Sequence, residues 1–295
     1  MGNRYKKGIS ILLCLVFLIV MAAPVAAEVL PVVASGVIVY SNEKAKVDAS
    51  NAGDGYIMVA YNGTAKSRLK VRVTGPSGIV YTYDLNRNGN YETFPLPDGN
   101  GKYTVGVYEN TTGNKYALVF RTPVTVMLTD SFAPFLRSNQ YVNFTADSQA
   151  VKKATELTKG KKNDLEKIAA IYEFVVTNLT YDKEKAKTVQ SGYLPDVDKV
   201  LAAKKGICFD YASLMTAMLR SQGIPTKLVV GYTGDVYHAW INTYIPEKGW
   251  VEGIIFFDGT TWKLMDPTFA SCANQSKQIM EYIGNGKNYS ARYVY

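Results

Sequence analysis

Short runs of alternating apolar and polar residues, bounded by turn formers, fill the first part of the chain, residues 28–128. Runs rich in β-branched and aromatic residues lie at 36–40, 56–61, 69–73 and 102–108. Turn formers separate them, with Asn-Gly at 62–63 and 88–89, Gly-Pro-Ser-Gly at 75–78 and Asp-Gly-Asn-Gly at 98–101. Regularly spaced short strands with almost no helical periodicity predict an all-β sandwich of the immunoglobulin-like kind over residues 28–128.

The periodicity becomes helical after a segment at residues 129–150, which we interpret as a linker. Asn163 followed by Glu166 is a helix-start signal, and an apolar face continues from Leu165 to a predicted end near Asn178. A second helix is predicted to begin around Cys208 and to stop at Gly223, which Ile-Pro follows. Residues 183–190 give no firm pattern.

Four β-type runs follow the second helix, at residues 226–232, 238–245, 250–257 and 261–266. Asp258-Gly259 predicts a tight turn between the last two runs. Helices followed by antiparallel strands indicate a second domain over residues 151–295, so the predicted fold class is α+β with two domains.

The amino terminus reads as a secretory signal peptide over residues 1–27. Basic residues precede an apolar run from Ile9 to Ala23, and small residues end at Ala27. The apolar run is shorter than the ~20 residues that span a membrane, although an uncleaved anchor is the alternative. We therefore expect a secreted or cell-envelope-associated protein.

Charge and composition exclude several classes of protein. Loss of residues 1–27 removes three positive charges, so the formal net charge falls from +8 to +5. The lysines are scattered through polar faces, so no nucleic-acid partner is expected. One histidine and two distant cysteines cannot form a compact ligand set, so neither a metal nor another cofactor is expected.

Two cysteines remain after export, Cys208 and Cys272. In an exported protein a disulfide between them is one interpretation. The predicted helix start at Cys208 suggests another, because unpaired backbone N–H groups and the helix dipole stabilise a reactive thiolate there. A buried cysteine that packs as a small hydrophobe is the third.

A cysteine nucleophile needs a base, and His238 is the one histidine in the chain. It opens a predicted strand in which Trp240 lies on the same face, where an indole ring could exclude water or simply pack in the core. Asp266 ends the last predicted strand, immediately before Pro267. A carboxylate at that strand end could orient the imidazole. An Asp-Pro turn would also explain Asp266, and the rival acid Asp258 is explained by its hairpin turn.

Taken together, these segments resemble the transglutaminase-like superfamily, in particular its secreted bacterial members related to papain-type thiol enzymes. The matching segments are GICFDYA at 206–212, GIP at 223–225, VVGY at 229–232, HAW at 238–240 and WKLMDPT at 262–268. The resemblance implies a papain/transglutaminase-like catalytic domain with Cys208 as nucleophile, His238 as general base and acid, and Asp266 as orienting carboxylate. The interval between His238 and Asp266 is longer than the family's usual one. Tyr181 and Trp240 match the family's aromatic positions and are the candidate substrate-binding residues.

The implied reaction is acyl transfer through a Cys208 thioester, which either water or an amine resolves. The expected partners are extracellular or cell-envelope proteins or peptides that supply a peptide bond or a glutamine carboxamide. The alternative is a non-catalytic binding protein that uses the same scaffold. The sequence does not decide between hydrolysis and transamidation, nor does it give the oligomeric state.

Overall fold

The computed structural model describes residues 29–64, 66–246, 248–252, 255–257, 262–264 and 289–295. The predicted signal peptide, Asp266 and Cys272 lie outside these residues. Within the described part of the chain, no helix combines the length and apolar character needed to cross a membrane.

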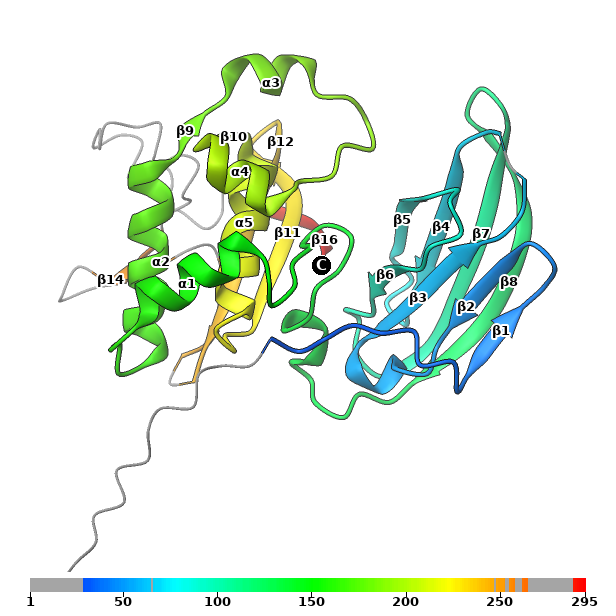
Figure 1. Ribbon diagram of the computed structural model, residues 1–295, viewed down its shortest axis with the longest axis horizontal. Helices are drawn as coiled ribbons and strands as arrows, with labels where there is room; N and C mark the ends of the chain where they lie inside the picture. The colour runs from blue at the N-terminus through cyan, green and yellow to red at the C-terminus, as the bar shows by residue number, and fades with distance from the viewer. Residues whose placement is uncertain (1–28, 65, 247, 253–254, 258–261, 265–288) are drawn as a thin grey trace, which may run out of the picture.

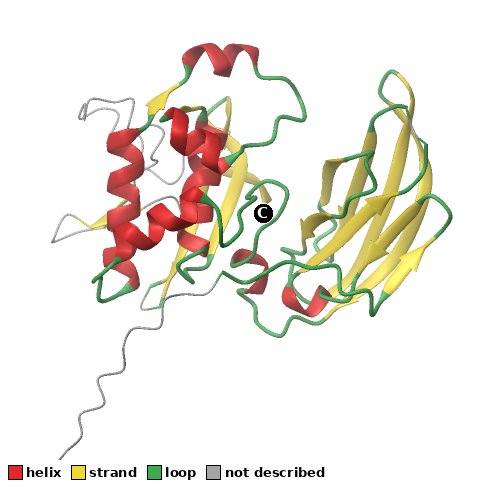
Figure 2. Cartoon of the chain, viewed as in Figure 1, coloured by secondary structure: helices red, strands yellow, loops and turns green. Residues whose placement is uncertain are grey.

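The N-terminal region, residues 39–126, holds two four-stranded antiparallel sheets (Figures 1 and 2). One sheet has the order β1-β2-β3-β6, formed by β1 (Val39–Ser41), β2 (Ala45–Asp48), β3 (Tyr56–Tyr61) and β6 (Glu92–Pro95). The other has the order β5-β4-β7-β8, formed by β4 (Leu69–Thr74), β5 (Val80–Leu85), β7 (Gly101–Thr112) and β8 (Lys115–Val126). A short 3-10 helix, η1 (Ala52–Asp54), precedes β3.

Along several of these strands, side chains alternate between buried and exposed positions, as expected of a strand with one face in the core. In β4, Leu69, Val71 and Val73 are buried while Arg72 is exposed. One face of the strand therefore enters the core and the other meets water. The strands predicted at 56–61, 69–73 and 102–108 are confirmed, whereas the run at 36–40 forms a strand only from Val39 onward.

The segment between the two regions is anchored to the N-terminal region. It contains the 3-10 helix η2 (Ala133–Phe135) and a β-bridge between Asn139 and Val142. Arg137 forms an ion pair with the Asp54 carboxylate at 3.1 Å and donates a hydrogen bond to the Asp54 carbonyl at 3.0 Å. These bonds hold the segment against η1.

The described residues of the C-terminal region, 149–295, form five helices: α1 (Gln149–Thr158), α2 (Asp164–Asn178), α3 (Lys183–Thr188), α4 (Val197–Ala203) and α5 (Cys208–Arg220). The predicted start of α2 is confirmed, because the Asn163 side chain accepts a hydrogen bond from the backbone N–H of Glu166 at 2.9 Å. Its predicted end at Asn178 is also confirmed. The helix α5 ends three residues before Gly223, the glycine predicted to stop it, and Gly223 takes a positive φ of 76°.

The helix α5 packs against α1, α2 and α4 and also against the sheet of the C-terminal region. That sheet has the antiparallel order β13-β12-β11-β16, formed by β11 (Thr226–Thr233), β12 (Val236–Ile245), β13 (Gly249–Val251) and β16 (Tyr289–Val294). The prediction of one strand over 250–257 is wrong. This run divides into β13, which pairs with β12, and β14 (Ile255–Phe257), which pairs with β15 (Trp262–Leu264).

The two regions share a buried contact at Tyr295, near the point marked C between the lobes of Figure 1. The Tyr295 ring lies 5.7 Å from that of Tyr81, 5.8 Å from that of Tyr83 and 4.5 Å from that of Tyr141, measured between centroids. Edge-to-face aromatic pairs of this kind contribute about 0.5–1.5 kcal/mol each beyond the area they bury. The contact therefore fixes the C-terminal sheet against β5.

Arg220 reinforces the same junction from the end of α5. The guanidinium is buried and donates hydrogen bonds to the carbonyls of Thr226 at 2.9 Å, Arg137 at 2.6 Å and Tyr295 at 2.7 Å. Burial lowers the pKa of Arg220 to about 9. One side chain thereby links α5, β11, the chain after β16 and the segment between the regions.

Candidate active site

Cys208 is the first residue of α5, as predicted. Its thiol is free and half-buried in the structure, and because Cys272 lies outside the described residues the disulfide interpretation stays a prediction. The helix has 13 residues, so unpaired backbone N–H groups and the positive end of its dipole lie at Cys208. A helix start is a common position for a cysteine nucleophile.

A short parallel ladder fixes the chain just before Cys208. The strand β10 (Lys205–Gly206) pairs with β9 (Thr180–Tyr181), with Gly206 opposite Tyr181. The N–H of Asp182 donates to the Gly206 carbonyl at 2.8 Å. Regular backbone pairing therefore holds the chain up to Gly206, two residues before Cys208.

His238 lies on β12 and is 5% exposed. The strands β11 and β12 both pack against α5, and His238 and Cys208 line the same cleft, which has a volume of about 710 Å³. Burial is the main cause that raises the pKa of Tyr237, the residue before His238, and Tyr293, Tyr232 and Cys208 contribute less. The fold thus brings the predicted thiol and imidazole to one cleft.

The other three predicted site residues differ in their placement. Tyr181 lines the cleft, beside Gly206. Trp240 is buried on β12, its ring 6.3 Å from that of His238 and 5.3 Å from that of Tyr289, and it is not among the described residues that line the cleft. Asp266 lies outside the described residues.

The N-terminal region also contributes to the cleft, which the sequence did not indicate. Asp84 of β5 lines it, together with Gln140 and Tyr141 from the segment between the regions. Asp84 already forms ion pairs with Arg68 at 3.0 Å and Lys70 at 2.8 Å. It is the only Asp, Glu, Lys or Arg among the described residues of the lining, so the wall is mostly apolar, aromatic or neutral.

A buried carboxylate two residues after Cys208 also went unassigned in the sequence. Asp210 is fully buried, and its Oδ2 atom accepts the backbone N–H of Ile207, the residue that caps α5, at 2.8 Å. Lys185 donates to Asp210 Oδ2 at 2.7 Å, and the Tyr193 hydroxyl donates to Asp210 Oδ1. An acidic residue at the third position of a predicted helix is a known capping signal, and it could have identified Asp210.

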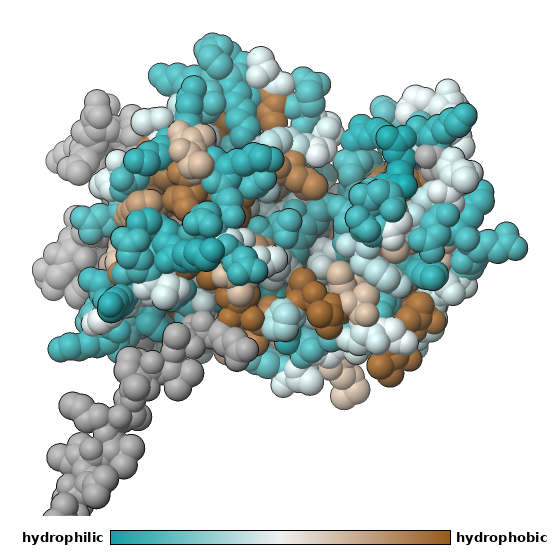
Figure 3. Space-filling view, in the orientation of Figure 1, coloured by the Kyte–Doolittle hydropathy of each residue, from teal (hydrophilic) through white to brown (hydrophobic). Residues whose placement is uncertain are grey.

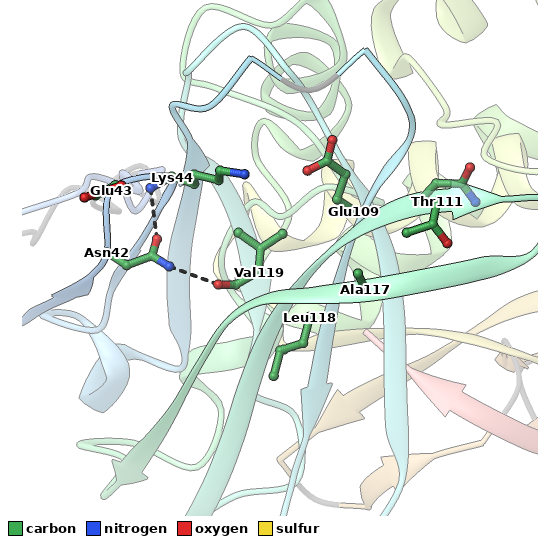
Figure 4. Close-up of a pocket in the computed structure, with 9 residues that line it drawn as sticks. Asn42, Glu43, Lys44, Glu109, Thr111, Ala117, Leu118 and Val119 are labelled. Carbon is green, nitrogen blue, oxygen red and sulfur yellow. Dashed lines mark hydrogen bonds between the residues drawn. The ribbon is translucent and has the colours of Figure 1, made fainter.

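A second hollow, of about 630 Å³, lies in the N-terminal region between the β1–β2 turn and the β7–β8 hairpin (Figure 4). Asn42 spans it, because its amide donates to the Val119 carbonyl at 2.9 Å and its Oδ1 atom accepts the Lys44 N–H at 3.0 Å. None of the described residues that line it carries a thiol or an imidazole, whereas Cys208 and His238 both line the other cleft.

The described residues include no group of three or more His, Cys, Asp or Glu side chains arranged to hold a metal ion.

In the space-filling view, hydrophilic residues cover most of the visible face, and hydrophobic residues form small separate groups (Figure 3). The Cys208 thiol and the His238 imidazole line one cleft, and the described residues of its wall are mostly apolar, aromatic or neutral.

Residues 151–253 match the transglutaminase-like superfamily. An uncharacterized protein of Bacillus subtilis, YebA, is 33% identical over 118 residues, which cover 33% of this chain and 16% of YebA. A protein-glutamine gamma-glutamyltransferase of Pseudomonas aeruginosa is 28% identical over 98 residues, 28% of this chain and 13% of that protein. The chain thus corresponds to a small part of the length of these relatives.

Among solved structures, the periplasmic domain of TgpA from Pseudomonas aeruginosa aligns with 83% of this chain and 100% of its own. The sequence identity is 16% and the TM-score is 0.38.

Proposed function

Because residues 151–253 belong to the transglutaminase-like superfamily, we propose that this chain is a cysteine acyl-transfer enzyme with Cys208 as its nucleophile. The observation that carries the proposal is that a free thiol at a helix start and the buried His238 imidazole line one cleft. Two side chains of these types, brought from a helix and a strand to one concavity, are what nucleophilic catalysis by a thiol requires.

In the proposed reaction, the Cys208 thiolate attacks the carbonyl carbon of a carboxamide or peptide bond. The C–S bond forms, the C–N bond breaks, and the His238 imidazolium gives its proton to the leaving nitrogen. Water or a primary amine then attacks the thioester, with His238 accepting the proton of the incoming nucleophile. Asp266 is proposed to orient the imidazole, and Tyr181 to contact the substrate from β9.

The lining of the cleft supports a neutral peptide as the acyl donor. Among the described residues of the wall, Asp84 is the one carboxylate and is paired with two basic side chains, and no Lys or Arg lines the cleft. Charged side chains next to the scissile carbonyl would lose hydration here without gaining a partner. Glutamine and peptide carbonyls flanked by neutral residues fit better.

We also propose that the chain acts outside the cytoplasm on cell-envelope or extracellular proteins, which the signal-peptide pattern of residues 1–27 supports. The N-terminal region is proposed to be an immunoglobulin-like domain. Its strand order supports this, because consecutive strands β2 and β3 share one sheet, β4 and β5 the other, β6 returns to the first and β7 and β8 to the second.

The test is product analysis by mass spectrometry with a library of glutamine-containing peptides, with and without a primary amine. Amine adducts indicate transamidation, new termini indicate proteolysis, and the small mass gain of deamidation indicates hydrolysis of glutamine. Cys208→Ala should abolish each product, and His238→Asn should slow its formation by about 10²-fold or more. Cys272→Ala is the matched control and should keep full activity.

Absence of any product from the wild-type chain would contradict the proposal. It would favour a binding protein built on the same scaffold. Loss of activity in Cys272→Ala but not in Cys208→Ala would show that the nucleophile is misassigned.

A further inference from the structure

The buried Asp210 carboxylate poses an electrostatic problem at the candidate active site. It is useful to the helix, because it satisfies the Ile207 N–H at the start of α5. It is also a negative charge, two residues from the position where the proposed function needs a thiolate. In a poorly solvated site, two negative charges on the same turn of a helix oppose each other.

Lys185 on α3 supplies the opposite charge. Its ammonium lies 2.7 Å from Asp210 Oδ2 and 2.6 Å from the Tyr193 hydroxyl, and it lies 4.2 Å from the centre of the Tyr193 ring. The Lys185 side chain is 29% exposed and that of Asp210 is 0% exposed, so the pair is at the edge of the protein interior. Among the described residues, Lys185 is the one cationic side chain in hydrogen-bonding contact with Asp210.

We infer that Lys185 is a positioning residue that cancels the charge of Asp210, so that the carboxylate caps α5 without opposing a thiolate at Cys208. The inference rests on the proposed function, because it assigns Lys185 a role in activating the same nucleophile. Lys185 does not line the cleft, so it acts through Asp210 and does not contact substrate.

Other charged and titratable groups face this site from the neighbouring elements. Among the described residues they are Asp182, which caps α3, Tyr193 of the following loop, Asp196 before α4, Lys205 of β10, Tyr237 and His238 of β12, and Asp84 of β5. The other carboxylates have their own cations: Asp182 pairs with Lys205 at 3.2 Å and Asp196 with Lys199 at 2.9 Å. Asp84 pairs with Arg68 and Lys70. Among these carboxylates of the described residues, removal of Lys185 therefore leaves Asp210 without a cation.

Tyr193 completes the arrangement but cannot replace Lys185. Burial raises the pKa of Tyr193, and the hydrogen bond to Asp210 and the charge of Asp210 raise it further. The hydroxyl therefore stays neutral at ordinary pH and donates one hydrogen bond to the carboxylate. A neutral donor stabilises Asp210 without cancelling its field at Cys208.

The experiment measures the rate at which iodoacetamide alkylates Cys208 in the full chain between about pH 5 and about pH 9, where thiolate formation sets the rate. Peptide mass spectrometry separates Cys208 from Cys272. Lys185→Met should shift the profile to higher pH and slow alkylation at neutral pH by about tenfold. Lys185→Arg should keep the wild-type profile. Lys187→Met is the matched control on the same helix, because Lys187 pairs with the exposed Glu184 at 3.1 Å.

Two further variants separate an electrostatic role from a structural one. Asp210→Asn should shift the profile to lower pH, the direction opposite to Lys185→Met. The double variant Lys185→Met/Asp210→Asn should return towards the wild-type profile. A double variant as slow as Lys185→Met, or a Lys185→Met profile identical to wild type, would overturn the inference. Asp210→Asn keeps the test decisive if Lys185→Met does not fold.

The wild-type profile distinguishes this inference from the proposed function. If Cys208 reacts like an ordinary thiol with no dependence on His238, the proposed function fails and the inference fails with it. If Cys208 is reactive and depends on His238, but its profile does not respond to Lys185→Met, only the inference fails.

Discussion

Gly231 on β11 lies directly opposite His238 on β12. A Cβ atom at Gly231 would lie 2.0 Å from the Ser290 carbonyl oxygen and 2.9 Å from the Trp240 ring. The register between β11 and β16 shifts at this glycine, so the bulge brings the β16 backbone against it. The β16 backbone therefore packs closely against Gly231, opposite the residue that carries the imidazole, and only glycine leaves room for this contact.

Gly231→Ala should destabilise the protein by about 2 kcal/mol, because the new methyl group has to displace β16 or the indole ring. Urea unfolding followed by tryptophan fluorescence measures the effect. Gly53→Ala is the comparison and should cost less than Gly231→Ala, since its new Cβ would lie 3.3 Å from the Met127 carbonyl oxygen, a tight contact that a shift of a few tenths of an ångström relieves. Equal stability of Gly231→Ala and wild type would show that the close approach is not required.

Tyr181 and Trp240 should respond differently to substitution. Tyr181→Phe removes a hydroxyl from a residue of the cleft wall, so kcat/KM should fall by about tenfold with little change in stability. Trp240→Phe acts on a buried ring that packs on Tyr289, so it should cost about 1–2 kcal/mol of stability with little change in KM. Steady-state kinetics and urea unfolding on both variants make the comparison. The reverse pattern would place Trp240, not Tyr181, at the substrate.

Stability should fall in alkaline solution because of the aromatic junction between the two regions. Burial raises the pKa of Tyr141 from 10.0 to about 12. A raised pKa in the folded state means that the unfolded chain loses its proton first. The neutral Tyr141 side chain therefore contributes fully to the free energy of unfolding below about pH 10, and this contribution is lost as the pH rises to about 12.

From the shift of Tyr141 alone, the free energy of unfolding should fall by roughly 2–3 kcal/mol over this interval. Urea unfolding at a series of pH values measures it. Tyr141→Phe should show a shallower decline than wild type, whereas Tyr40→Phe, at an exposed position, should not. A free energy of unfolding that is constant up to about pH 11 would contradict the expectation.

Local signals explain what could be predicted from the sequence. The Asn163 cap, the start of α5 at Cys208 and the strands β11 and β12 depend on cap residues and on periodicity within a few residues. The helices α1 and α4 and the strand β16 were not predicted. In β16 most side chains are exposed or half-buried, and the strand owes its form to pairing with β11, about 60 residues earlier in the chain.

Only the site residues with a distinctive side-chain chemistry could be predicted from the sequence. Cys208 and His238 stand out because thiols and imidazoles are rare in this chain. Asp84 and Tyr141 enter the cleft through packing between distant segments. The Lys185–Asp210 pair joins residues 25 positions apart, which no local pattern reveals. Asp266 stays a prediction.

Detection of a covalent intermediate tests the central claim most directly. Wild-type protein mixed with a reactive glutamine peptide is quenched in acid, digested and analysed by mass spectrometry. We predict an acyl group on the Cys208 peptide that hydroxylamine removes, as expected of a thioester, and that is absent from Cys208→Ala. An acyl group on Cys272, or product formation by Cys208→Ala at the wild-type rate, would contradict the assignment of Cys208 as the nucleophile.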